Sequence, residues 1–141
     1  MSWDVMIFAL PSPPPRFAEM PDGWDGDPLG PADEVRSRIS KLLPEVSWSD
    51  PTWGIYEGNG FSYEFNMGTD EPIANVMVHV RGGGDATKPL LQLAQEYGWC
   101  LLDTSTTEWL HHADRLEAGW ETFQAYRDKV LARVRDEGSE Q

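Results

Sequence analysis

The chain has 141 residues, a formal net charge of −13 and a hydrophobic content of 40%. This length fits a single domain with a real core, and the apolar content argues against disorder. The negative charge argues against direct binding to a nucleic-acid backbone and favours a cationic partner.

The acidity is concentrated in the middle of the chain. No lysine or arginine lies between Lys41 and Arg81. The same segment contains six acids, namely Glu45, Asp50, Glu57, Glu64, Asp70 and Glu71. The C-terminal segment from Asp114 to Glu137 is nearly balanced. The acidity therefore belongs to the body of the domain, where it forms a binding surface or serves only to solubilise the protein.

Several features favour a cytoplasmic location. No uninterrupted apolar run approaches the length of a membrane-spanning helix. Residues Met1 to Leu10 carry an acidic residue where a secretory signal has a basic one. The single cysteine, Cys100, fits a reducing compartment and is expected to be a buried thiol. We expect no cofactor, no metal and no contact with membrane or nucleic acid.

The first part of the chain predicts a strand, a loop and a helix. Ser2–Leu10 is almost continuously apolar, as in a buried strand. Pro11–Leu29 contains six of the eleven prolines and predicts a long surface loop. Pro31 and the acids after it favour the start of a helix, and apolar residues from Val35 onward at helical spacing extend it to Pro44.

The middle of the chain predicts a turn followed by a hairpin. Val46–Gly54 contains a polar stretch flanked by two tryptophans, Trp48 and Trp53, and predicts a turn. Trp53–Glu57 and Phe61–Met67 predict the two arms of the hairpin, joined at Gly58-Asn59-Gly60, because Asn-Gly is the preferred two-residue turn. In the second arm apolar and polar residues alternate, so one face packs and the other stays exposed.

A central strand and a glycine turn follow the hairpin. Val76–Arg81 alternates valines with mixed residues, which is typical of a sheet strand. Gly82–Gly84 predicts a turn, and Asp85 is expected to cap the next helix by accepting a hydrogen bond from a free backbone N–H. That helix is predicted from Ala86 to Gly98, where glycine favours its end.

The last part of the chain predicts a short strand and a long helix. Trp99–Asp103 is the strand, Thr104–Thr107 is a turn, and Glu108–Leu110 can resume extended structure. Residues 114–137 carry one apolar stripe and predict the helix. The order β-α-β-β-β-α-β-α predicts a single α+β domain with a mainly antiparallel sheet of about five strands and helices on one face.

Four short motifs resemble those of a family of small acidic bacterial proteins. They are Ser2-Trp3-Asp4, Trp48-Ser49-Asp50-Pro51-x-Trp53-Gly54, Val78-His79-Val80-Arg81-Gly82-Gly83-Gly84-Asp85, and Tyr97-Gly98-Trp99 leading to Leu102-Asp103-x-Ser105-Thr106. The resemblance covers about residues 2 to 110. Proteins of this kind are similar to the immunity proteins of secreted, polymorphic toxin systems. The resemblance implies a non-enzymatic binding protein and brings no catalytic residue with it.

The first functional hypothesis is therefore a cytoplasmic immunity protein that neutralises a basic toxin domain. Aromatic residues in polar turns beside uncompensated acids are the mixture expected where a basic partner docks. The predicted partner-binding residues are Trp24, Trp48, Asp50, Trp53, Glu57, Glu64, Asp70 and Glu71. The protein would act as a monomer or a homodimer.

Two alternatives remain open. A small ligand-binding or enzymatic domain could use the glycine turn and the Asp103–Thr106 loop, and it predicts a concave pocket between them. Its candidate residues are Arg81, Gly82, Gly83, Gly84, Asp85, Asp103 and Ser105. The turn lacks a phosphate-binding motif, and Arg81 is expected to pair with Asp85, Glu64 or Asp103. The other alternative is a homo-oligomeric structural domain that exposes a sheet edge.

Overall fold

A computed structural model describes residues 2–9, 27–106, 108–110 and 113–139. Most of the predicted proline-rich loop, including Trp24, lies outside these ranges. The elements are β1 (Trp3–Phe8), α1 (Ala32–Leu42), β2 (Ser47–Asp50), β3 (Trp53–Glu57), β4 (Phe61–Asn66), β5 (Val76–Gly82), α2 (Thr87–Tyr97), β6 (Cys100–Asp103), β7 (Glu108–Trp109) and α3 (Ala113–Ser139).

The strands form one sheet in the order β2-β3-β4-β5-β1-β6-β7, and every neighbouring pair is antiparallel. β1 lies between β5 and β6, which explains why its sequence is apolar at almost every position. The predicted α+β class is confirmed. Among the described residues the sheet has seven strands where about five were predicted, because β2 and the short β7 extend its two edges.

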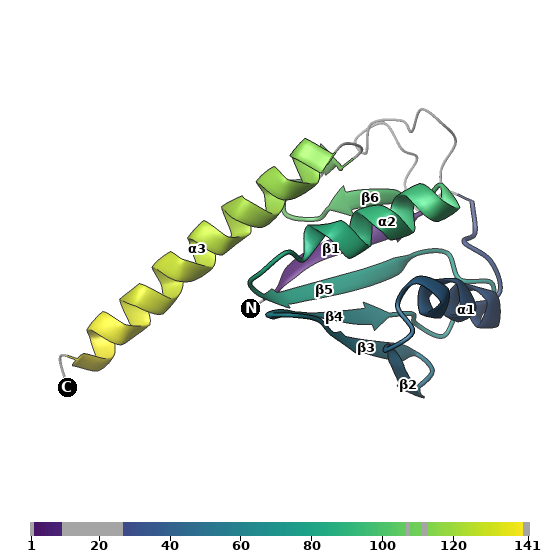
Figure 1. Ribbon diagram of the computed structural model, residues 1–141, viewed down its shortest axis with the longest axis horizontal. Coiled ribbons are helices and arrows are strands. Elements are labelled where there is room, and N and C mark those ends of the chain that lie inside the picture. Colours follow the sequence, from purple (N-terminus) through teal and green to yellow (C-terminus); the bar gives the residue numbers. More distant parts are fainter. Residues whose placement is uncertain (1, 10–26, 107, 111–112, 140–141) are drawn as a thin grey trace.

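The core lies between the sheet and the helices. Val5 and Ile7 of β1 face the same side as Val78 and Val76 of β5, with which they pair. All four side chains are fully or almost fully buried. Buried residues of α1 and α2 belong to the same cluster, and Figure 1 shows both helices on one side of the sheet. The predicted one-sided helix layer is confirmed for these two elements.

α1 and α2 end largely as their sequences predict. α1 follows Pro31 and stops just before Pro44. α2 ends at Gly98, whose φ of 66° is the left-handed conformation that favours glycine. The predicted cap at the start of α2 is wrong. Ala86 is the N-cap residue, no side chain caps it, and Asp85 accepts only a 3.4 Å hydrogen bond from the Thr87 hydroxyl.

α3 runs from the sheet at the end where β1 begins and extends beyond the body of the domain (Figure 1). Its Trp120 packs on Trp3, with ring centroids 5.6 Å apart, so this part of α3 lies on the same face of the sheet as the other helices. Farther along the helix, Tyr126 is 60% exposed and Leu131 is 45% exposed. The predicted apolar stripe is therefore not covered by the domain at Leu131.

Two further local predictions are corrected. β2 occupies part of the stretch that was predicted to be a turn, because a polar sequence can still form an edge strand when a neighbour supplies the pairing. The Cys100 side chain is partly exposed and not buried, since its strand lies next to the short edge strand β7.

Candidate functional site

The face of the sheet that points away from α1 and α2 is called here the open face. Along β3 to β5 it comprises Trp53, Ile55, Glu57, Ser62, Glu64, Asn66, Met77, His79 and Arg81. One register row crosses four strands, from Ile55 through Glu64 and His79 to Asp4 of β1. The open face therefore combines apolar, acidic and basic side chains in adjacent positions.

His79 lies at the centre of a small polar network on this face. Its Nδ1 is 2.7 Å from Oδ1 of Asp4, and the Ser2 hydroxyl donates to the same oxygen at 2.5 Å. The Trp53 ring stacks on the imidazole with centroids 5.6 Å apart and planes 23° apart. The His79 ring, two strands away, thus supports one side of the Trp53 ring.

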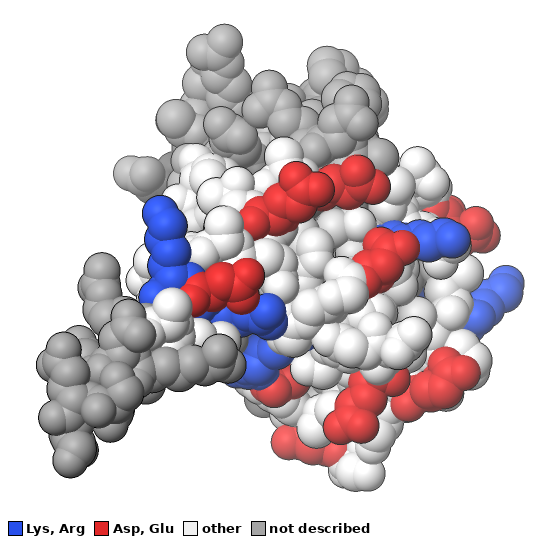
Figure 2. Space-filling view, turned by 60° about the vertical axis from the view of Figure 1, so that its left-hand side comes forward, with Lys and Arg blue, Asp and Glu red and all other residues white. Residues whose placement is uncertain are grey.

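Ile55 is 45% exposed between Trp53 and Glu57 on β3. Glu57, Asp50 and Asp70 are exposed as well, and none of them forms an ion pair with a basic side chain in the described ranges. On the face of the molecule shown in Figure 2, several acidic side chains likewise lie without a basic side chain beside them.

Glu64 and Arg81 form an ion pair across β4 and β5, which confirms one of the three pairings predicted for Arg81. Asp50 accepts hydrogen bonds from the hydroxyl and the backbone N–H of Thr52 at 2.7 and 2.9 Å. These two bonds hold the pKa of the Asp50 carboxyl below its usual range, and the bond from the Thr52 hydroxyl contributes more than the bond from the backbone N–H. The carboxyl therefore carries its charge at neutral pH.

Two of the predicted partner-binding residues make structural contacts on the covered side or at a helix end. The Trp48 indole packs near Phe65 and donates to the Ser40 hydroxyl at 2.8 Å. The carboxylate of Glu71 accepts hydrogen bonds from the Ala32 N–H, at 3.1 Å and 3.3 Å to its two oxygens, and so caps the start of α1. The structure therefore places Trp48 away from Trp53, Glu57 and Glu64, which share the open face.

The glycine turn is docked against α3. The Gly82 carbonyl accepts hydrogen bonds from Gln124, at 2.9 Å, and from Arg127. The Gly84 carbonyl accepts from the Trp120 indole N–H at 3.0 Å. At Gly82 an added Cβ would lie 2.6 Å from the Gly60 carbonyl oxygen, so glycine is needed for close contact with the hairpin turn.

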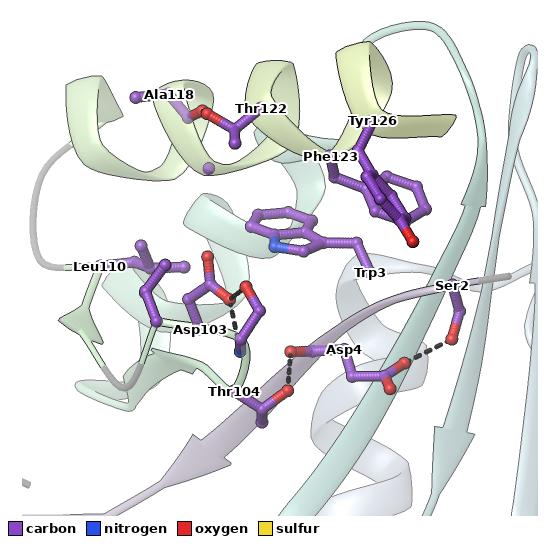
Figure 3. Close-up of a pocket in the computed structure, with 13 residues that line it drawn as sticks. Ser2, Trp3, Asp4, Asp103, Thr104, Leu110, Ala118, Thr122, Phe123 and Tyr126 are labelled. Atoms are coloured by element: carbon purple, nitrogen blue, oxygen red, sulfur yellow. Dashed lines mark hydrogen bonds between the residues drawn. The ribbon is translucent and has the colours of Figure 1, made fainter. Parts of the chain in front are cut away.

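The Asp103–Thr106 loop lies elsewhere, beside a cavity of about 530 Å³ beneath α3. Figure 3 shows the loop, the start of β1 and α3 around this space. Asp103 and Ser105 line it, whereas the residues of the glycine turn do not. The two segments of the ligand-binding alternative are thus not joined by one pocket among the described residues.

Sequence reasoning missed Ile55, Asp4 and Trp3 as candidate surface or cavity residues. Ile55 sits at an outward position of an alternating strand, and that alternation could have identified it as exposed. The roles of Asp4 and Trp3 depend on contacts with residues far along the chain, and no local sequence pattern indicates such contacts.

Within the described ranges, no group of three or more histidine, cysteine and acidic side chains could hold a metal ion. The helices of these ranges are also too short or too polar to cross a bilayer. No protein-family model, curated protein or solved structure matches the chain.

Proposed function

We propose that this protein is a non-enzymatic cytoplasmic binding protein that neutralises a basic toxin domain, as an immunity protein does. The open face of β3 to β5 is its docking surface. The observation that carries the proposal is the exposed Ile55. It lies between Trp53, which stacks on His79, and an exposed glutamate, on a face that neither α1 nor α2 covers.

The arrangement has the features of a protein-recognition surface. Aromatic residues in fixed orientations are frequent energetic centres of interfaces, because they bury a large area at little entropic cost. Trp53 meets that description, since the His79 ring supports one side of it. Ile55 supplies an apolar contact beside it.

The acidic rim of the open face selects the kind of partner. Asp50 in this rim pairs with Trp53 across β2 and β3, and Asp70 lines a pocket with Asn66 and Met77. Glu57, Asp50 and Asp70 are exposed acids without ion pairs to the described basic side chains. A basic protein would gain complementary contacts and faster association from this rim, and salt would slow that association. An acidic partner would be repelled.

The test uses the product of the neighbouring gene as the toxin domain. Co-expression of this protein with the toxin domain should restore the growth of cells that the toxin domain inhibits. Calorimetry with the purified toxin domain should detect a complex. Ile55→Lys and Glu57→Lys are each expected to weaken binding at least tenfold, because each places a cation against a basic partner.

The matched control is Leu131→Lys, which changes an equally exposed apolar residue on α3. It should protect cells as well as the unchanged protein. If the Ile55 and Glu57 variants protect cells as well as the unchanged protein does, the open face is not the toxin-binding surface. If the product of the neighbouring gene neither harms cells nor binds this protein, the immunity role itself is wrong.

A further inference from the structure

The cavity beneath α3 contains a buried donor with no acceptor. The Trp3 side chain is 2% exposed, and its indole Nε1–H has no hydrogen-bond partner among the described residues. Leaving a buried N–H unsatisfied costs about 1–3 kcal/mol, so such groups are rare without a reason. Figure 3 shows the indole nitrogen on the edge of the ring that faces the Asp103 side of the cavity.

A buried carboxylate lies near this donor but does not accept its N–H. Asp103 is 2% exposed. Its Oδ1 accepts hydrogen bonds from the Ser105 backbone N–H at 3.0 Å and from the Ser105 hydroxyl at 2.7 Å. Its other oxygen is directed at α3, because a Cβ added at Gly119 would lie 3.1 Å from Asp103 Oδ2.

Gly119 leaves the space between these two groups open. The same added Cβ would lie 3.0 Å from Cζ2 of Trp3, on the indole edge that carries the nitrogen. A side chain at this position would therefore press on both Trp3 and Asp103. Because the residue is glycine, Trp3 and Asp103 both face the same unfilled point of α3 at the floor of the cavity.

Part of the remaining wall favours a flat apolar body. Leu110, Phe123 and the exposed Tyr126 line the cavity beside polar residues such as Asp4, Thr104 and Thr122, and none of the described side chains that line it is basic. A volume of about 530 Å³ falls within the range of small-molecule sites, which are mostly apolar with a few placed polar groups.

We propose that this cavity binds a small planar molecule bearing a carboxamide or a cyclic amide. Its carbonyl accepts from Trp3 Nε1–H, and its N–H donates to Asp103 Oδ2. A carboxylate would be repelled by Asp103, and a simple amine would leave the Trp3 donor unsatisfied. Ser2 and Asp4 of the His79 network also line the cavity, but its floor at Trp3, Asp103 and Gly119 lies beneath α3, and the proposal does not rest on the toxin-binding proposal.

The test follows the Trp3 indole N–H signal of the ¹⁵N-labelled full chain by NMR, with Trp3→Phe used to assign it. Benzamide, benzoate and benzylamine are titrated separately. Benzamide should shift the Trp3 signal and bind at least tenfold more tightly than either of the other two. Equal binding of all three, or no shift of the Trp3 signal, would overturn the proposal and leave a cavity that holds only water.

Asp103→Asn tests the pairing itself. Asparagine keeps an oxygen for Ser105 and turns the second acceptor into a donor, so the floor then offers two donors. Benzoate should now bind more tightly than benzamide. An unchanged preference would show that Asp103 does not contact the ligand, which contradicts the proposal.

Gly119→Ala fills the space between α3 and the Trp3–Asp103 floor of the cavity. The variant should fold, because alanine has a higher helix propensity than glycine. Benzamide affinity should fall at least tenfold. Gly83→Ala is the control, because its nearest neighbour would be 3.6 Å away. Unchanged affinity in Gly119→Ala would place the ligand elsewhere.

Discussion

Gly54 is the residue at which β3 passes beneath the indole of Trp48. A Cβ at this position would lie 2.4 Å from a ring carbon of Trp48, and the ring is also held by its hydrogen bond to Ser40. Gly54→Ala should therefore lower the free energy of unfolding by about 1–3 kcal/mol through overpacking. Urea denaturation measures this change. Gly83→Ala, which meets no close atom, should change it by less than about 0.5 kcal/mol.

Tyr63 is fully buried, and its hydroxyl donates to the Ala86 carbonyl. Burial raises the pKa of this phenol far above its usual value near 10. Above about pH 10 the unfolded chain releases the phenol proton of Tyr63, while the folded protein keeps it. The stability due to Tyr63 is therefore complete below pH 10 and falls above it. The slope approaches about 1.4 kcal/mol per pH unit.

Tyr63→Phe should remove that slope, although it costs about 1 kcal/mol at neutral pH through the lost hydrogen bond. Tyr126→Phe changes an exposed tyrosine and should leave the slope in place. Unfolding free energies measured from pH 8 to 11 distinguish them, and identical slopes in the two variants would show that Tyr63 ionises freely in the fold.

At the scale of the helix, α1 depends on a residue far along the chain for its N-terminal cap. Pro31 provides no side-chain cap, and Glu71 accepts the Ala32 N–H instead. Glu71→Ala should cost about 0.5–1 kcal/mol, because it removes both an acceptor and a negative charge from the helix start. Asp70→Ala next to it is the control. If Asp70→Ala loses as much stability as Glu71→Ala, the loss comes from the removal of any negative charge in this loop and not from the cap.

α3 combines a docked half and a projecting half. Trp120 packs on Trp3 and donates to Gly84, whereas Leu131 is exposed. Trp120→Ala should therefore cost about 3–5 kcal/mol in unfolding free energy. A chain that stops after residue 130 should lose less than about 0.5 kcal/mol. Thermal unfolding followed by circular dichroism compares the two, and a large loss on truncation would mean that the projecting half packs in solution.

For the molecule as a whole, the elements that could be predicted from the sequence are those with a clear local pattern of apolar and polar residues. The alternation in β4 and β5 and the helical spacing in α1 identify those elements without any knowledge of their neighbours. β2 was missed because Ser47, Ser49 and Asp50 are polar, and its pairing with β3 alone makes it a strand.

The sites were harder to predict because their contacts are long-range. The cap of Glu71 on Ala32 joins residues 39 positions apart. The cavity brings Trp3, Asp103 and Gly119 together from both ends of the described chain. Trp48 looked like a binding residue because its turn is polar, yet its ring packs near Phe65. Composition alone does not distinguish these two uses of a tryptophan.

The net charge of −13 makes a prediction at the scale of the whole molecule. Like charges on a compact protein repel one another, so an exposed acid without a partner destabilises the fold at low salt. Asp70→Lys changes the net charge from −13 to −11, since it removes one negative charge and adds one positive charge. It should raise the unfolding free energy by a few tenths of a kcal/mol at about 0.02 M NaCl, and the gain should vanish near about 0.5 M because salt screens the repulsion.

Glu64→Lys is the matched comparison. It also changes the net charge by two, but it removes the ion pair with Arg81 and sets two cations side by side, so stability should fall. Equal effects of the two variants would mean that only total charge matters. If Asp70→Lys is more stable but binds the toxin domain more weakly, the acid is retained for recognition at the expense of stability. If it is more stable and binds equally well, Asp70 does not contribute to the interface.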